Sequence, residues 1–194
     1  YLADSNGSPF CTATLIDNDV AITAQHCIEG TYPVESMRFG MGDPSNPRAL
    51  IPVHSAPYHG TRDVALLLLQ QDAVSLVPEA EPLPFLRSQP DQSLVGTSVE
   101  AAGYGQTNNG EDGRFFVTVE LTEIQADWLV VNGWGQQGIC FGDSGGPLLI
   151  HVDNGEPVIA GVESHGDSSC LDQDFETRLD MATDWIDQQM GNFN

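Results

Sequence analysis

The chain of 194 residues is long enough to bury one core, and its 40% hydrophobic and 18% charged residues are typical of a globular protein. It carries 28 acidic residues against six arginines and no lysine, a formal net charge of −22 that repels nucleic acid and anionic membranes. No apolar run comes near the ~18 residues of a membrane span. We therefore expect no nucleic-acid partner and no membrane insertion, and we interpret the acidity as solubility or adaptation to a salty medium, with partner binding as the alternative.

Short apolar or alternating runs, broken by Gly, Pro, Asn and Asp, recur along the chain and are typical of an all-β protein. The candidate strands are 10–16, 20–23, 37–41, 49–53, 64–69, 98–103, 115–121, 128–131, 147–152 and 157–164. A proline-rich stretch, 77–94, predicts a linker between a first half, 1–76, and a second half, 95–179. No internal repeat accompanies these elements, so we expect a single unit.

The last segment, 180–194, predicts a C-terminal helix. Met181, Trp185 and Ile186 fall at helical intervals, and Asp180 precedes them as an expected cap.

The four cysteines are Cys11, Cys27, Cys140 and Cys170, and they permit three disulfide connectivities. Paired cysteines indicate an oxidising compartment, so we expect a secreted or periplasmic protein. No signal-peptide pattern is present, as expected of a processed chain. No cysteine or histidine spacing suggests zinc, and the segment 42–48 offers few side-chain oxygens for calcium. We therefore expect no metal and no cofactor.

Three segments carry residues suited to catalysis. Residues 142–147 read Gly-Asp-Ser-Gly-Gly-Pro, where small neighbours make Ser144 accessible as a nucleophile. His26 stands beside Cys27, and Asp63 immediately precedes an apolar strand. Taken alone, Gly142 to Gly146 also fits the Gly-x-Ser-x-Gly elbow of α/β-hydrolases.

Together these segments resemble the chymotrypsin-like (trypsin-fold, S1-type) serine proteases. The order His26, Asp63, Ser144 is that family's order, whereas an α/β-hydrolase would place serine first and histidine last. The resemblance implies an all-β fold of two six-stranded antiparallel Greek-key barrels with a C-terminal helix and a catalytic cleft between the barrels. It also implies disulfides Cys11–Cys27 and Cys140–Cys170. Short loops and only two disulfides favour a bacterial, secreted member.

The resemblance implies a role for each residue of the site. Ser144 would attack the scissile carbonyl, His26 would accept its proton, and Asp63 would orient the imidazole. The backbone N–H groups of Gly142 and Ser144 would form the oxyanion hole. In the family, the residue at Asp143 is structural: it pairs with the α-ammonium of an Ile-Val-type segment that is freed when a propeptide is removed.

No such segment precedes Cys11 in this sequence. Because a buried unpaired charge is costly, we expect one of three arrangements for the carboxylate of Asp143. It pairs with an upstream segment, it pairs with a substitute donor, or its loop is disordered as in a zymogen.

The substrate pocket can be expected from the same resemblance, which places seven residues on it: Gly138, Phe141, Glu163, Ser164, His165, Gly166 and Asp174. Gly138 and Asp174 are expected on the floor, Phe141 at the rim and Glu163 on the wall. Carboxylates without a compensating arginine favour Arg or Lys at the P1 position of a polypeptide substrate. If Asp174 misses the pocket, Phe, Tyr or Leu would be preferred, and glutamyl specificity is the third alternative.

The rival to an enzyme is a non-catalytic or zymogen-like protease homologue that binds a partner. A proteinaceous inhibitor or a propeptide is the further partner that the resemblance suggests.

Overall fold

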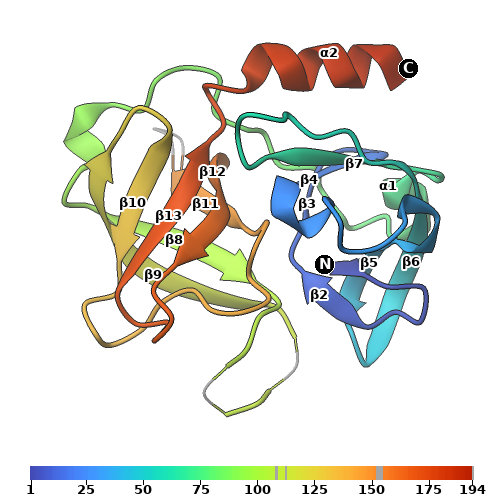
Figure 1. Ribbon diagram of the computed structural model, residues 1–194, viewed down its shortest axis with the longest axis horizontal. Helices are drawn as coiled ribbons and strands as arrows, with labels where there is room; N and C mark the ends of the chain where they lie inside the picture. The colour runs from blue at the N-terminus through green and yellow to red at the C-terminus, as the bar shows by residue number, and fades with distance from the viewer. Residues whose placement is uncertain (108, 112, 152–154, 194) are drawn as a thin grey trace.

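The computed structural model describes residues 1–107, 109–111, 113–151 and 155–193, and its strands form two bodies that lie side by side (Figure 1). The first body is a seven-stranded antiparallel sheet in the order β2-β1-β5-β6-β7-β4-β3. Its strands are Leu2–Ala3 (β1), Pro9–Cys11 (β2), Thr14–Asp17 (β3), Val20–Thr23 (β4), Arg38–Asp43 (β5), Asn46–Ser55 (β6) and Ala65–Leu69 (β7).

The second body is a closed antiparallel barrel in the order β10-β13-β12-β11-β8-β9. Its strands are Ser98–Gly103 (β8), Phe115–Ile124 (β9), Trp128–Asn132 (β10), Pro147–His151 (β11), Pro157–Gly166 (β12) and Gln173–Arg178 (β13). The helices are η1 (Gln25–Cys27), η2 (Val34–Ser36), α1 (Ala73–Leu76), η3 (Gln92–Leu94) and the terminal α2 (Thr183–Phe193), which Figure 1 shows above the first body.

The predicted all-β fold with two barrel-like sheets and a C-terminal helix is confirmed. The second barrel has the expected six strands, whereas the first is a half-barrel of seven.

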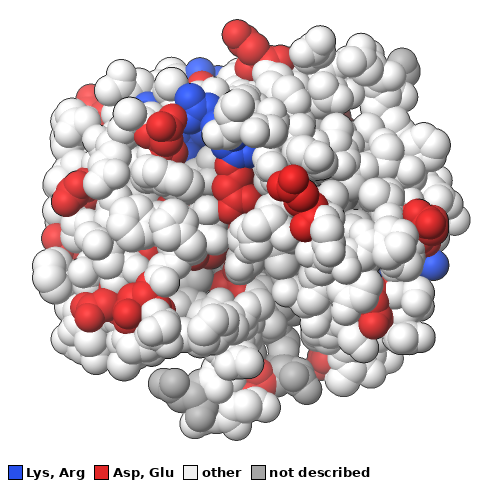
Figure 2. Space-filling view, viewed as in Figure 1, with Lys and Arg blue, Asp and Glu red and all other residues white. Residues whose placement is uncertain are grey.

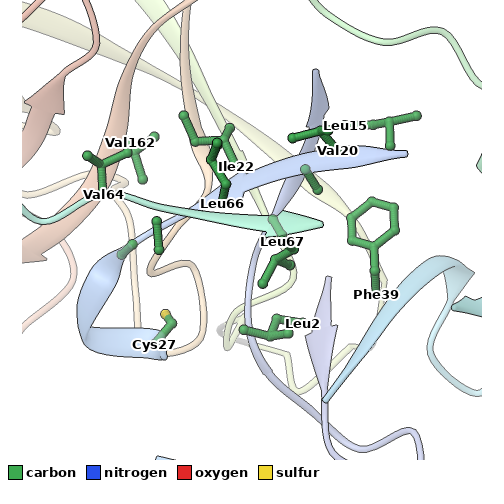
Figure 3. Packing of buried hydrophobic residues seen from close by; sticks show 14 of the residues in the cluster. Leu2, Leu15, Val20, Ile22, Cys27, Phe39, Val64, Leu66, Leu67 and Val162 are labelled. Atoms are coloured by element: carbon green, nitrogen blue, oxygen red, sulfur yellow. The ribbon is translucent and has the colours of Figure 1, made fainter. Parts of the chain in front are cut away.

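A shared hydrophobic core joins the two bodies. Every residue of β4 and β7 is buried, because these strands lie inside the first sheet. Figure 3 shows Ile22, Val64 and Leu66 beside Val162 of β12, which belongs to the same buried cluster. Side chains near the junction of the two bodies are therefore held by packing from both sides.

Two expected elements differ from the structure for identifiable reasons. The predicted strand 10–16 divides into β2 and β3, because Thr12 turns its hydrogen-bonding groups toward the Ser144 loop. The expected cap Asp180 instead accepts hydrogen bonds from the Arg178 guanidinium at 3.0 and 2.6 Å, and α2 begins at Thr183. Strands β1 and β13 were absent from the prediction, and Val152 and Asn194 of the predicted elements lie outside the described residues.

Acidic side chains are scattered over both bodies on the face drawn in Figure 2, rather than gathered in one patch. On this face, the distribution favours a general effect on solubility over a single acidic docking surface.

Candidate active site

His26 and Asp63 are brought together by the pairing of β4 with β7. Thr23, at the end of β4, pairs with Ala65, at the start of β7. Because the strands are antiparallel, His26 on η1 and Asp63 before β7 leave the sheet at the same end.

The carboxylate of Asp63 receives three hydrogen bonds. The His26 backbone N–H donates to Oδ1 at 2.9 Å, and the His26 ring contacts Oδ2 through Nδ1 at 2.7 Å. The Ser164 hydroxyl donates to Oδ2 at 2.5 Å. Burial alone would raise the pKa of Asp63, but these hydrogen bonds outweigh it and hold the pKa below its ordinary value. The carboxylate thus fixes the imidazole through Nδ1 and leaves Nε2 for proton transfer.

Ser144 lies on a tight loop with two unused amide donors. Gly142 has a φ of 100°, in the left-handed region that favours glycine. The N–H groups of Asp143, Gly145 and Gly146 all donate to backbone carbonyls. Among the hydrogen bonds of the described residues, the N–H groups of Gly142 and Ser144 donate to none. Two free amides beside a serine hydroxyl are what an oxyanion-binding site requires.

The Cys11–Cys27 disulfide lies between this loop and the histidine. The sulfur of Cys27 lies 3.9 Å from His26 Nε2 and 3.6 Å from the carbonyl oxygen of Ser144, so both residues contact the same atom. Cys11–Cys27 and Cys140–Cys170 are both formed, which confirms the two expected pairings. Among the described residues, one group of potential metal ligands is compact enough to hold an ion: Cys11, His26 and Cys27. Both cysteines are joined in a disulfide and therefore offer no thiolate.

Thr12 is a residue that the sequence analysis did not single out. Its backbone N–H donates to the Ser144 carbonyl at 2.8 Å, and its hydroxyl donates to the Gly142 carbonyl at 3.0 Å. The same hydroxyl accepts from the Tyr104 N–H at 3.0 Å, and the Thr12 carbonyl accepts from the Thr23 hydroxyl at 2.7 Å. Thr12 therefore fixes the Ser144 loop against the first sheet. The available signal was weak, since Thr12 is one of two threonines within the otherwise apolar run 10–16.

The carboxylate of Asp143 accepts hydrogen bonds from backbone amides. The Gly105 N–H donates to Oδ1 at 2.8 Å and the Cys140 N–H to Oδ2 at 2.9 Å. Burial raises the pKa of this carboxyl, and the two hydrogen bonds act in the opposite direction. In the part of the chain that the structure describes, Asp143 forms no ion pair. Its carboxyl group lines a cavity of about 200 Å³ behind the Ser144 loop.

Ser144 also lines a pocket of about 260 Å³. This is smaller than the ~300–1,000 Å³ of sites that hold a whole small molecule, and it suits one side chain. Six of the expected pocket residues line it together with Ser144: Phe141, Glu163, Ser164, His165, Gly166 and Asp174. Gly138 lines the cavity behind the loop instead, and a side chain at that position would meet the Cys170 carbonyl oxygen at 2.5 Å.

Three buried carboxyl groups lie at this pocket or beside it. Asp174 lies against the backbone of Gly166 and reaches toward the Ile139 N–H, and burial raises its pKa to about 7. Glu163 and Glu176 are directly paired across β12 and β13. Burial raises the pKa of Glu163 well above its ordinary value and that of Glu176 to about 8. The sequence analysis missed Glu176 because β13 lacks the apolar alternation that marks a strand.

His165 occupies the segment expected to face the substrate backbone. Its exposed ring stacks on Phe175 with centroids 4.8 Å apart and packs edge-on against Trp128. Its Nδ1 lies 3.2 Å from the Ser164 hydroxyl, which in turn binds Asp63. His165 is thus connected to the His26–Asp63 pair through one hydroxyl group.

Comparison with known proteins identifies the family. The model of the family described as Trypsin matches residues 2–186. The chain belongs to the trypsin family. Its relatives within this family include Melanization protease 1 of Drosophila melanogaster, 27% identical over 93% of this chain and 58% of that protein. Azurocidin of Homo sapiens is 29% identical over 97% of this chain and 80% of that protein.

Among solved structures, human heparin binding protein matches this trypsin-family chain with a TM-score of 0.79 and 26% identity, over 98% of this chain and 90% of the other. The chain spans 58% of the length of Melanization protease 1. Trypsin-family proteases act on polypeptides and are regulated by protein inhibitors, and two disulfides fit an extracellular protein. None of the helices within the described residues is long and apolar enough to cross a membrane.

Proposed function

We propose that this trypsin-family chain is a secreted serine endopeptidase that acts through an acyl-enzyme on Ser144, with residues 1–194 working as one unit. The proposal rests on the backbone N–H groups of Gly142 and Ser144, for which no described residue provides a hydrogen-bond acceptor. Beside them lies His26, whose ring Asp63 holds through Nδ1. The oxyanion of a substrate would supply the acceptor that these two amides lack among the described residues.

The proposed reaction has the following steps. Ser144 Oγ attacks the scissile carbonyl carbon while His26 Nε2 takes the hydroxyl proton, and Asp63 stabilises the imidazolium that results. The developing oxyanion accepts hydrogen bonds from the Gly142 and Ser144 amides. His26 then gives its proton to the leaving amine. A water molecule, deprotonated by His26, hydrolyses the ester of Ser144 in the second half of the reaction.

Arg or Lys at P1 is the specificity that the pocket supports best. Glu163 and Asp174 both line it, and neither is paired with an arginine among the ion pairs of the described residues. The described residues that line the pocket include no arginine or lysine to pair with a glutamyl side chain. An apolar side chain could contact Ile139 and Phe141, so chymotrypsin-like specificity is the alternative.

The second candidate is a non-catalytic or zymogen-like protein that binds a partner, and Asp143 is the residue that favours it. In the trypsin family a free α-ammonium forms an ion pair with this carboxylate, whereas here, within the described residues, two backbone amides donate hydrogen bonds to it. Heparin, after which the structural relative is named, is a poor match for this chain, because a net charge of −22 repels a polyanion.

Hydrolysis of arginyl, phenylalanyl and glutamyl chromogenic peptides tests both the reaction and its specificity. We expect turnover of the arginyl peptide and a loss of several orders of magnitude in kcat for Ser144→Ala with an unchanged fold. Equal turnover by wild type and Ser144→Ala would remove Ser144 from the mechanism. Turnover of the phenylalanyl peptide alone would replace the P1 assignment and leave the mechanism in place.

A further inference from the structure

Ser164 and His165 follow each other in β12, yet their side chains meet. In a regular strand, successive side chains point to opposite faces of the sheet. Here the pairing of β12 with β13 is irregular. Glu163 pairs with Glu176, and the next pair is His165 with Phe175, so two steps along β12 correspond to one step along β13. Such a bulge redirects a side chain, and Nδ1 of His165 consequently lies 3.2 Å from the Ser164 hydroxyl oxygen.

Two aromatic neighbours hold the His165 ring in this orientation. Phe175 stacks on the ring with an interplanar angle of 4°, and Trp128 packs edge-on against it with centroids 5.0 Å apart. Trp128 and Phe175 also contact each other edge to face, with centroids 6.4 Å apart. Because the ring itself is exposed to solvent, these contacts rather than burial limit its rotation and keep Nδ1 toward the hydroxyl group.

The direction of the hydrogen bond between His165 and Ser164 follows from Asp63. Burial acts to raise the pKa of the Asp63 carboxyl, but its hydrogen bonds hold the pKa below the ordinary value, so the group is ionised near neutral pH. An ionised carboxylate can only accept, and the one hydroxyl proton of Ser164 is therefore directed to Asp63 Oδ2, 2.5 Å away. The hydroxyl has no second proton for its other partner. Nδ1 of His165 must therefore carry a proton and donate it to the Ser164 oxygen.

We propose that His165 is a positioning residue: it fixes the Ser164 hydroxyl, which in turn holds the carboxylate of Asp63. Through that carboxylate it steadies the imidazole of His26, the base of the proposed function, on which this inference rests. A serine hydroxyl with a single partner still rotates, whereas a donor to its oxygen leaves one orientation for its proton. Hydrogen bonds in series also polarise one another, so the Nδ1–H of His165 strengthens the donation to Asp63. Within the described residues, His165 is the donor that reaches the Ser164 hydroxyl.

Nitrogen NMR of the protein with isotope-labelled histidine tests where the proton lies. In the neutral ring of His165 we expect the proton on Nδ1 and none on Nε2, because the hydrogen bond to Ser164 selects this tautomer. The spectrum of His165→Asn identifies the resonances by their absence. The measurement is made on Ser144→Ala as well as on wild type, so it does not depend on turnover. A neutral ring with its proton on Nε2 could not donate to Ser164 and would overturn the proposal.

Two replacements separate the hydrogen bond from the stacking. His165→Phe keeps an aromatic ring against Phe175 and loses the donor, whereas His165→Asn loses the ring and keeps an N–H donor at the same distance along the side chain as Nδ1. We expect kcat for the chromogenic peptide that wild type hydrolyses to fall about two- to tenfold in His165→Phe and to recover largely in His165→Asn. An unchanged kcat in His165→Phe, or an equal loss in both variants, would overturn the proposal.

Ser164→Ala tests whether His165 acts through the hydroxyl. If it does, adding His165→Phe to Ser164→Ala should lower kcat no further than Ser164→Ala alone. Independent losses that multiply would show another route and would also overturn the proposal. His54→Phe is the matched control, since His54 is exposed and lies beside the ring of Phe193 with centroids 6.0 Å apart, and it should keep the wild-type kcat.

Failure of this inference can be told apart from failure of the proposed function. Labelling by a small fluorophosphonate reports on Ser144 and its base, because the reagent carries no peptide to contact His165. Labelling of wild type, together with a proton on Nε2 of His165, would refute the positioning role alone. Conversely, a proton on Nδ1 without any labelling would refute the catalytic proposal alone.

Discussion

Replacing Gly142 by alanine should damage catalysis through a backbone that glycine alone accepts comfortably. Its φ of 100° costs an L-residue about 1–2 kcal/mol. The added Cβ would also lie 2.9 Å from Gly105 Cα, closer than real Cβ atoms approach, so the loop must shift. A displaced Gly142 N–H no longer points at the oxyanion. Losing one such donor lowers kcat by ~10²–10³, or about 2.7–4 kcal/mol.

Gly96→Ala is the matched control. Gly96 has a φ of 83°, and its added Cβ meets nothing within 4 Å. Urea unfolding should show a loss of about 1–2 kcal/mol for Gly96→Ala and a larger loss for Gly142→Ala. Turnover of the arginyl peptide should fall only in Gly142→Ala. If both variants lose stability but retain wild-type kcat, the Gly142 amide does not bind the oxyanion and the reasoning fails.

Three further changes probe other parts of the structure. Thr12→Val should lower kcat while KM stays constant, because the Gly142 carbonyl loses its hydrogen-bond donor. Thr12→Ser should restore the rate. If serine does not restore it, the loss in Thr12→Val comes from packing and not from the hydroxyl. Burial raises the pKa of Glu176 from 4.5 to about 8, so between these pH values the native state holds a proton that the unfolded state has lost. The free energy of unfolding should therefore fall as pH rises through this range, by at most ~1.4 kcal/mol per pH unit per proton. Thermal melts should show a shallower fall in Glu176→Gln, and an unchanged slope would contradict the buried-acid assignment. Arg178→Met leaves Asp180, whose side chain is 4% exposed, without its partner and should cost about 3–5 kcal/mol in urea unfolding, whereas an unchanged midpoint would show that the ion pair is dispensable.

The sequence predicted the parts of the fold in which residue type and environment agree. The apolar run before and through β7 and the alternation in β9 mark strands directly, since their buried positions carry apolar side chains. Strand β13 was missed because its buried positions include Asp174, Glu176 and Arg178, which a hydrophobic pattern cannot reveal. The surroundings of these acids are set by the pairing of β13 with β12, which hydrophobic alternation does not reveal.

The same distinction applies to the site. His26, Asp63 and Ser144 could be named because local motifs surround each of them, and the structure places His26 against Asp63 and beside the Ser144 loop. Thr12 could not be assigned a role, because three of its four hydrogen bonds join it to residues more than ninety positions away, Tyr104, Gly142 and Ser144. Gly138 was expected on the pocket floor, but the path of the backbone near Cys170 places it on the neighbouring cavity.

The proposed mechanism depends above all on Ser144 being an activated nucleophile beside a formed oxyanion hole. Intact mass spectrometry after incubation with a fluorophosphonate tests this most directly, with Ser144→Ala and untreated wild type as controls. We predict one adduct per chain, located on Ser144 by peptide mapping and absent from Ser144→Ala. A folded wild-type chain that forms no adduct, or that forms it equally in Ser144→Ala, would contradict the mechanism.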